Sequence, residues 1–390
     1  MIPRVLLVTG AYYPEISSAA RQCRDVARQL AGRVQFEVLA TAVDRSLPMV
    51  ETVDGVTVHR LPIEVDSARS RVIAGLRLAA IVARVKRRVD LVHVHGFSTK
   101  NVPLTILTKT FRMPLILTLH TAGQDDPASV KRRGGLASWA YRQADLVTTV
   151  SRQLSNDSAD GGPAANVIEI PNGVDTVRFR PATGDERLAL RRRLGLPVEG
   201  SQILFVGFFS RDKRPDLLCD AWIRLAGRSA DPISLVCVGA AESKYFEVDP
   251  GLAERMRRSA RDAGLEDRLI LVEPTHAIDD YFRSTDIFAL PSAREAMPMA
   301  LLEAMACGLP CVAYRLSGST DVLVEDGVNG ILASDSAQFG AALESLLRDR
   351  IRAEAFGARA RKTVVERYSL DRTADRWLEA YRRVLSERSR

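Results

Sequence analysis

Short apolar runs that alternate with helical stretches constrain this 390-residue chain more than any other feature. The runs are rich in Val, Ile and Leu and apolar at nearly every position, which is typical of strands buried on both faces of a parallel sheet. They lie at residues 4–9, 36–41, 90–95, 114–120 and 145–150, and again at 202–207, 233–239, 268–272, 286–291 and 310–314. We therefore expect two doubly wound α/β domains, because a single core rarely grows beyond about 300 residues.

The restart of the pattern after residue 181 indicates the domain boundary. We predict a Rossmann-like domain over residues 1–178, a second over 182–370, and a last amphipathic helix over 371–390 that packs back on the first domain. Ligands of open α/β sheets bind beyond the carboxyl ends of the strands. Two such domains therefore predict a cleft between them.

Composition narrows the class of protein. The chain is 46% hydrophobic and 26% charged, as is usual for a globular protein. Its first residues, MIPRVLLVTGAYYPEI, form too short an apolar run for a signal peptide or a membrane span. The five cysteines are scattered without zinc-like spacing, which favours buried thiols in a reducing compartment. We expect a cytoplasmic protein.

Positive charge is concentrated in the first half, where residues 1–181 hold 24 Lys and Arg against 16 Asp and Glu. This excess either aids solubility or indicates an anionic partner. Arg77, Arg84 and Arg88 share one stripe of a helix expected over residues 70–90. The stripe could rest on anionic lipid at the inner face of a membrane, or form the outer face of a packed helix. Basic residues are not interleaved with aromatic ones, so nucleic acid is not an expected partner.

Two glutamates follow the apolar run at 286–291. Glu295 and Glu303 lie eight positions apart in SAREAMPMALLEAMACGLP, in which a helix is expected from about Pro298 to Cys307. The N-terminus of a helix presents N–H groups and a positive dipole end that bind phosphate. Carboxylates on either side of a phosphate suit a ligand with vicinal hydroxyls. Alternatively, both glutamates are surface residues.

The segment after the run at 202–207 has the features of an anion site. Gly207 permits close approach of the backbone, and Arg211, Lys213 and Arg214 crowd the following turn. The alternative is a solvated basic turn.

Three histidines lie at the ends of neighbouring expected strands. His93 and His95 alternate on one strand and share a face, and His120 ends the next strand. A metal site would need further ligands, so none is expected. A structural role for these histidines remains open.

Six segments in register resemble the retaining glycosyltransferases of family 4: DLVHVHG, LTLH, PNGVDTVRFRP, VGFFSRDKRPDLL, DIFALPSAREAMP and DVLVEDGVNGIL. The resemblance covers nearly the whole chain and includes the E-x7-E motif of that family. It implies the GT-B fold and transfer of a sugar, with retention, from a UDP- or GDP-linked donor to an acceptor hydroxyl. It further implies a glycan or lipid-linked acceptor in glycoconjugate biosynthesis, the acceptor on the first domain, and no metal or other cofactor.

The resemblance also assigns roles around the motif. Glu295 would contact hydroxyls of the donor sugar, and Glu303 would contact the ribose. The backbone amides of Ala296, Met297 and Met299 would lie near sugar and phosphate.

Further roles fall on the loop after Gly207 and on one histidine. Lys213 and Arg211 would hold the diphosphate and stabilise it as it leaves, and His120 would reach toward the sugar. The family's arginine directly follows the glycine, whereas Phe208 occupies that position here. Arg211 would therefore act from three residues further on.

The first loop departs from the family pattern as well. Ser17 and Ser18 stand where two glycines are common, and their hydroxyls could still donate to a phosphate or to the acceptor. This departure, together with Phe208, keeps open a non-enzymatic protein that binds a sugar nucleotide. A nucleotide-sugar epimerase of similar build is the second alternative.

Overall fold

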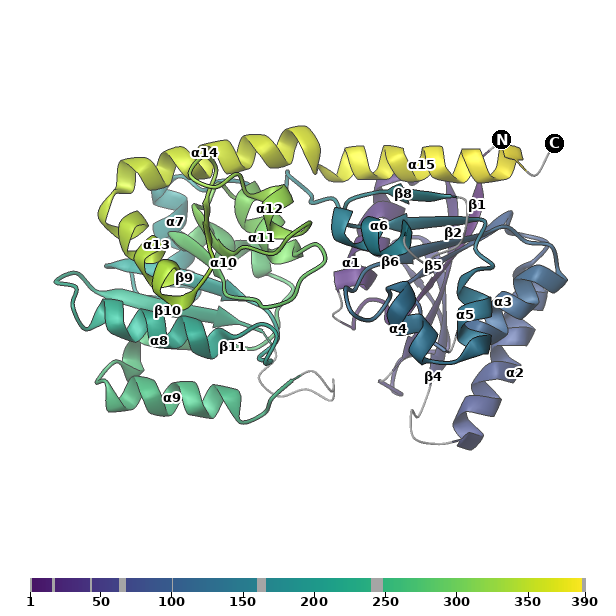
Figure 1. Cartoon of the computed structure of the whole chain (residues 1–390), viewed down its shortest axis with the longest axis horizontal. Coiled ribbons are helices and arrows are strands. Elements are labelled where there is room, and N and C mark those ends of the chain that lie inside the picture. Colours follow the sequence, from purple (N-terminus) through teal and green to yellow (C-terminus); the bar gives the residue numbers. More distant parts are fainter. Residues whose placement is uncertain are drawn as a thin grey trace. The chain divides into compact units, whose positions relative to one another are not determined.

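The computed structural model describes residues 2–15, 18–42, 44–62, 68–99, 101–159, 166–239 and 248–387 (Figure 1). The chain forms two compact units. Unit 1 comprises Met1–Gly173 with Leu370–Arg390, and unit 2 comprises Val174–Ser369. The chain therefore passes between the units at 173/174 and 369/370, whereas the sequence pattern had placed the divisions after 178 and 370.

Unit 1 is built on an eight-stranded sheet with the order β3-β4-β2-β1-β5-β6-β7-β8. All neighbours are parallel except β3 and β4. These two form a hairpin at Asp54 and Gly55, whose φ angles of 50° and 79° suit the turn that an Asp-Gly pair favours. The strands are β1 (Arg4–Thr9), β2 (Gln35–Ala42), β3 (Val50–Val53), β4 (Val56–Pro62), β5 (Leu91–His95), β6 (Leu115–Leu119), β7 (Leu146–Thr149) and β8 (Val167–Glu169).

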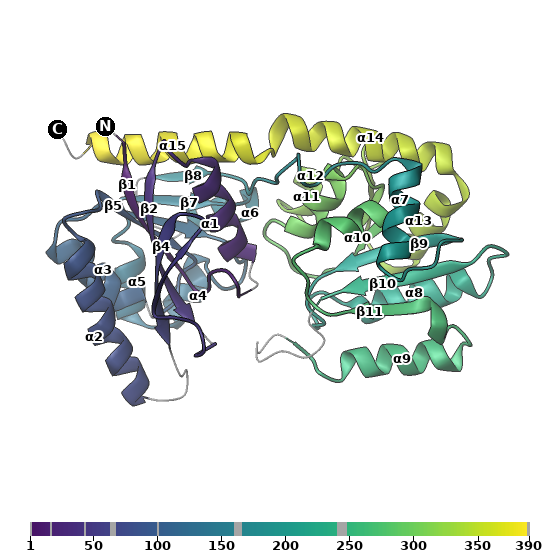
Figure 2. The ribbon, with the colours of Figure 1, turned by 180° about the vertical axis from the view of Figure 1, so that it is seen from behind.

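Helices of unit 1 form two groups by their contacts. α1 (Ser18–Gln29) packs against α15 (Leu370–Glu387) (Figure 2). The side chains of Trp377 and Tyr381 of α15 are buried in the core of this unit. The second group is α2 (Ala68–Val85), α3 (Asn101–Thr110), α4 (Pro127–Arg132) and α5 (Gly135–Tyr141), in which α3 contacts α2 and α5, and α4 contacts α5. The helix α6 (Arg152–Ala159) packs against β7 and β8.

Unit 2 contains a six-stranded parallel sheet with the order β11-β10-β9-β12-β13-β14. The direction of winding reverses between β9 and β12, which makes this pair the switch point where doubly wound folds bind ligands. The strands are β9 (Ser201–Val206), β10 (Ile233–Val238), β11 (Leu269–Val272), β12 (Ile287–Leu290), β13 (Cys311–Tyr314) and β14 (Ile331–Ala333). The expected class of two Rossmann-like folds is therefore confirmed.

The helices of unit 2 enclose this sheet between two buried apolar clusters. They are α7 (Gly184–Arg193), α8 (Pro215–Ala226), α9 (Leu252–Asp262), α10 (Ile278–Ser284), α11 (Met299–Ala306), α12 (Thr320–Leu323), α13 (Ser336–Arg348) and α14 (Arg350–Arg367), with a 3₁₀ turn at Glu266–Arg268.

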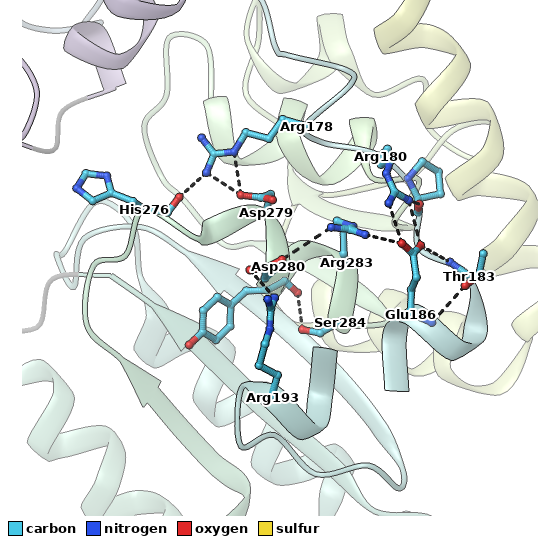
Figure 3. Close-up of polar contacts among 12 residues, drawn as sticks. Arg178, Arg180, Thr183, Glu186, Arg193, His276, Asp279, Asp280, Arg283 and Ser284 are labelled. Atoms are coloured by element: carbon cyan, nitrogen blue, oxygen red, sulfur yellow. Dashed lines mark hydrogen bonds and ion pairs between the residues drawn. The ribbon is translucent and has the colours of Figure 1, made fainter. Parts of the chain in front are cut away.

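A polar network explains why the segment after Gly173 belongs to unit 2 (Figure 3). Arg178 donates to Asp279 of α10 at 2.8 Å, and Arg180 pairs with Glu186 of α7 at 2.7 Å. The hydrogen bonds from Arg180 lower the pKa of Glu186 to about 2. Arg361 of α14 adds hydrogen bonds to two carbonyl groups of the same segment. Such contacts require side chains distant in sequence, so strand periodicity could not locate this boundary.

Candidate functional site

Two loops of unit 2 leave the switch point side by side. One follows β9 and contains residues 207–214, and the other follows β12 and contains residues 291–298. Because β9 and β12 are parallel neighbours, both loops leave the same edge of the sheet. The predicted basic loop and the predicted glutamate segment are thereby brought together.

The central contact between these loops is an ion pair between two predicted site residues. Lys213 Nζ lies 2.6 Å from Glu295 Oε1, and the Glu295 side chain is only 9% exposed. The backbone supports this contact one residue earlier, where Ala293 N–H donates to the Asp212 carbonyl at 2.7 Å. Arg294 Nε also donates to the Asp212 carboxylate at 3.1 Å. Glu295 is therefore not a simple surface residue.

The second loop leads into α11, close to where the sequence placed this helix. Pro298 is its N-cap residue, and Gly308, with φ of 72°, follows its C-terminus. The first N–H groups of an α-helix have no partner inside the helix and carry a partial positive charge. Met299 begins α11 and is buried, as is Ala296, whereas Met297 is half-buried.

Glu303 is 1% exposed within α11. The alternative of a helix-surface glutamate is therefore wrong. A buried carboxylate is costly unless it is paired or hydrogen-bonded. The residue type at position 303 is therefore constrained by the neighbouring protein groups and not by contact with solvent.

Two glycines lie close together where the basic loop begins: Gly207, directly after β9, and Gly239, directly after β10. Gly207 N–H donates to the Val238 carbonyl at 3.0 Å. A Cβ atom added at Gly239 would lie 1.8 Å from the Gly207 carbonyl oxygen, so no larger residue fits at Gly239. Gly239 is a residue that sequence reasoning did not select, although a glycine directly after a strand is its signal.

Arg211 and Phe208 lie differently from Lys213. Arg211 is exposed. The pKa of Asp249 is lowered mainly by a hydrogen bond from Arg255, and the positive charge of Arg211 lowers it further. Phe208 is half-buried, whereas its neighbour Phe209 is fully buried against Phe205 at a ring-centroid distance of 6.2 Å. The described contacts thus join Lys213 and Glu295 without Arg211.

Three histidines cluster in unit 1, where His93 and His95 of β5 are buried and His120, directly after β6, is half-buried. His95 Nδ1 lies 2.9 Å from His120 Nε2. His93 Nδ1 lies 2.9 Å from the hydroxyl of Tyr381 in α15, and its Nε2 lies 2.6 Å from Thr118 Oγ1. Burial lowers the pKa of His93 and His95 well below the usual value and that of His120 to about 4. All three imidazoles are therefore neutral at pH 7.

Asp125 is a second residue that sequence reasoning missed. Its carboxylate accepts the N–H groups of Phe97 at 3.0 Å, His120 at 2.9 Å and Thr121 at 3.0 Å. It is 5% exposed, and burial raises its pKa. Asp125 therefore fixes the backbone that carries His120 to the loop after β5. Its signal was weak, because an aspartate in a loop after a strand is common.

The basic stripe of unit 1 is shorter than expected. Arg77 and Arg84 lie exposed on α2, but the helix ends at Val85. Arg88 lies beyond it and pairs with Glu37 at 3.2 Å, so its membership of the stripe was wrong. Ser17 lies outside the described residues, and Ser18 begins α1.

Three further findings concern the described parts of the chain. No three His, Cys, Asp or Glu side chains gather there as a metal-binding group. No helix found there has both the length and the apolarity to cross a membrane. All five cysteines are free and buried, as expected.

Comparison with known sequences finds one family model that matches the first half of the chain and another that matches the second half. Residues 186–363 match the model of "Glycosyl transferases group 1", and residues 19–178 match that of "Glycosyltransferase Family 4". A D-inositol 3-phosphate glycosyltransferase of Kineococcus radiotolerans is 30% identical over 94% of this chain and 90% of its own. Its counterpart from Acidothermus cellulolyticus is 30% identical over 93% and 85%.

Solved structures show the same fold. The Anabaena HepE protein in complex with UDP and glucose superposes with a TM-score of 0.79 at 20% identity, over 97% of this chain and 99% of that one. Sucrose-phosphate synthase from Thermosynechococcus elongatus gives 0.80 at 19% identity, over 99% and 100%.

Proposed function

The chain belongs to glycosyltransferase family 4, and on this premise we propose that it is a retaining, metal-independent transferase acting on a UDP- or GDP-linked sugar. Membership confirms the expected GT-B glycosyltransferase that uses a nucleotide-sugar donor. Retention, metal independence, the roles of single residues and the acceptor go beyond membership. The observation that carries the proposed donor site is the contact between Lys213 and Glu295 at the switch point of unit 2.

We assign the donor to this switch point. The diphosphate lies at the N-terminus of α11, where the amides of Ala296, Met297 and Met299 meet it, and Gly207 begins the adjoining loop. Glu295 accepts hydrogen bonds from the sugar hydroxyls, and Glu303 from those of the ribose.

Lys213 supplies the positive charge that the leaving group needs. Without donor, Glu295 neutralises it at 2.6 Å, so its side chain is already held at the loop junction. As the bond from the anomeric carbon to the diphosphate breaks, negative charge grows on the diphosphate, and Lys213 and the α11 amides stabilise it. The acceptor oxygen attacks the same face of the sugar, and the departing phosphate oxygen takes its proton. Arg211 and His120 are secondary proposals, toward the diphosphate and the sugar respectively.

The decisive experiment is product analysis with a panel of UDP- and GDP-linked sugars. Binding of the right donor should raise the thermal midpoint. The anomeric configuration of the product, read from proton NMR coupling, should match that of the donor. An inverted product would disprove retention. Sugar conversion without acceptor would identify the epimerase alternative, and binding without any turnover would leave the non-enzymatic one.

Metal independence has its own test. A lysine and a helix N-terminus at the proposed diphosphate position supply positive charge, so turnover should survive EDTA nearly unchanged. Complete loss in EDTA that Mg²⁺ or Mn²⁺ restores would contradict this proposal.

We expect an anionic acceptor on unit 1. Residues 1–181 carry a net charge of +8, and the relatives are named D-inositol 3-phosphate glycosyltransferases. D-inositol 3-phosphate should therefore accept sugar better than unphosphorylated inositol, or compete better with another acceptor. Equal response to the two compounds would argue against an anionic acceptor.

We further propose that the acceptor side rests on an anionic membrane, from the cytoplasmic side. The contact is the α2–α3–α5 face, which we define by Leu76, Ile106, Leu136 and Trp139 together with two arginines, Arg77 and Arg84. Leu76 is 68% exposed, Leu136 61% and Trp139 36%, and exposed apolar side chains that gather on one face mark interaction sites. Apolar side chains beside arginines are typical of interfacial helices.

Vesicle sedimentation tests this face. Reversal of Arg77 and Arg84 to glutamate should remove at least about 2 kcal/mol of attraction, roughly 30-fold in partitioning to vesicles rich in anionic lipid. The matched control reverses Arg372 and Arg376, which are exposed on α15 in the other helix group of unit 1. Equal binding of both double variants, or equal binding to neutral vesicles, would refute membrane contact.

A further inference from the structure

Arg214, next to Lys213, has an unusual backbone conformation. Its φ and ψ of 49° and 48° are left-handed, and it is the N-cap residue of α8. Glycine adopts this region without steric cost, whereas other residues need surrounding contacts to hold them there. Two other described non-glycine residues have positive φ, Asp54 in a hairpin turn and Arg112 after α3. Arg214 alone of these three adjoins the candidate site.

The side chain of Arg214 makes the contacts that hold it. Its Nε donates to the carbonyl of Pro291 at 2.7 Å, and its guanidinium carbon lies 4.3 Å from the ring centroid of Tyr314. Pro291 directly follows β12, and Tyr314 is the last residue of β13. Arg214 therefore ties the loop after β9 to the ends of two neighbouring strands.

Three consecutive residues of that loop thus bond to the segment 291–295. Asp212 bonds to Ala293 and Arg294, Lys213 to Glu295, and Arg214 to Pro291. The side chains of Asp212 and Arg294 are 46% and 36% exposed, and exposed ion pairs contribute little. The contacts of Arg214 are half-buried and include an aromatic face, so they are the stronger anchor.

We infer that Arg214 is a positioning residue that clamps the two loops and so holds Lys213 and Glu295 together for the donor. This inference rests on the proposed function of these two residues. A donor that is preorganised toward developing charge needs no rearrangement during the reaction. A misplacement of about 1 Å can cost on the order of 100-fold in rate. The guanidinium is directed to protein groups, so it acts through Lys213 and not on the diphosphate.

The test compares Arg214→Gly with Arg112→Gly. Glycine suits the left-handed backbone at both positions, so both variants should keep their thermal midpoints, and Arg112 controls for loss of an arginine in this conformation. In Arg214→Gly we expect kcat to fall at least tenfold, donor KM to change less than threefold, and amides of residues 291–297 to exchange faster with D₂O. Arg214→Lys, which keeps the charge but loses the planar group, should fall in between.

Three results would overturn the inference. Normal kcat in Arg214→Gly would show that the clamp does not serve catalysis, and unchanged amide exchange would show that there is no clamp. A tenfold rise in donor KM at constant kcat would make Arg214 a direct ligand of the diphosphate. If the unaltered protein turned over no donor, the proposed function would fail instead, while the exchange measurement would still decide whether Arg214 clamps the loops.

Discussion

At the scale of single residues, the proposed chemistry depends on the contact between the carboxylate of Glu295 and the ammonium group of Lys213. Glu295 pairs with Lys213 in this structure, and our proposal has both groups gain new partners when the donor binds. The pair lies where two loops meet and is partly shielded from water, so its contribution exceeds that of an exposed ion pair.

Lys213→Ala should lower kcat by about 10²–10³, the usual cost of losing one preorganised donor to a developing oxyanion. The donor KM should change less, because charge on the diphosphate grows only as the bond breaks. Steady-state kinetics at saturating donor measures both. Normal turnover would make the loop a solvated turn and our mechanism wrong.

Arg211→Ala asks whether the displaced arginine takes part. Arg211 is exposed and has no described contact with Lys213 or Glu295, so we expect a loss of less than tenfold in kcat. A loss equal to that of Lys213→Ala would show that Arg211 reaches the diphosphate when donor is bound.

Glu303→Gln preserves the shape of a buried side chain and removes its charge. We expect nucleoside-diphosphate affinity to fall by about 1–3 kcal/mol, the scale of a hydrogen bond to a charged group. Calorimetric titration measures this, and the thermal midpoint serves as the control for folding. Unchanged affinity would limit Glu303 to packing within α11.

At the scale of elements, α15 joins the last residues of the chain to the first sheet. The ring of Trp377 lies tilted against His93 with ring centroids 4.4 Å apart, and the Tyr381 hydroxyl contacts the same imidazole. The helix thereby helps to exclude water from the histidine cluster, and this burial is what depresses the pKa values.

This burial predicts how stability depends on pH. Unfolded histidines have a pKa near 6.5, whereas that of folded His120 is about 4 and those of His93 and His95 are also lowered. Below pH 6.5 the unfolded chain therefore binds more protons, so the free energy of unfolding falls as pH drops toward 5. Each such proton contributes about 1.4 kcal/mol per pH unit.

Urea denaturation of the protein and of His120→Gln between pH 7 and 5 checks this dependence. The free energy of unfolding should fall less steeply with decreasing pH in the variant, because one histidine with a lowered pKa has been removed. Parallel slopes would mean that His120 titrates normally in the folded state.

At the scale of the whole molecule, the chain crosses between the units twice, at 173/174 and at 369/370, and glycine is required at the first crossing. A Cβ atom on Gly173 would lie 2.7 Å from Thr373 Oγ1 and 2.8 Å from Leu370 Cα, both at the start of α15. The approach is to backbone as well as to a side chain, so the clash cannot be relieved by a rotamer change alone.

Gly173→Ala should therefore lower the free energy of unfolding of unit 1 by about 1–3 kcal/mol and loosen the start of α15. Gly184→Ala is the matched control, since a Cβ atom there meets nothing within 4 Å. Thermal unfolding and amide exchange in α15 measure the effect. Equal stability of the two variants would contradict the packing at Gly173.

Much of the fold was already determined by local pattern. All ten apolar runs form strands, because burial on both faces demands apolar side chains at consecutive positions. Four strands were not predicted: β3, β4, β8 and β14. The Asp54–Gly55 pair is typical of a hairpin turn but was not used to predict β3 and β4, whereas β8 and β14 have only three residues each and carry little periodicity.

The sequence alone also indicated the candidate residues of the proposed donor site, since the glutamate spacing and the basic loop are local features. Only the tertiary structure decided which of them meet. It joined Lys213 to Glu295 across 82 positions, left Arg211 in solvent, buried Glu303 and removed Arg88 from its helix. These outcomes depend on strand order and on packing between distant segments, and neither can be deduced from the spacing of neighbouring residues.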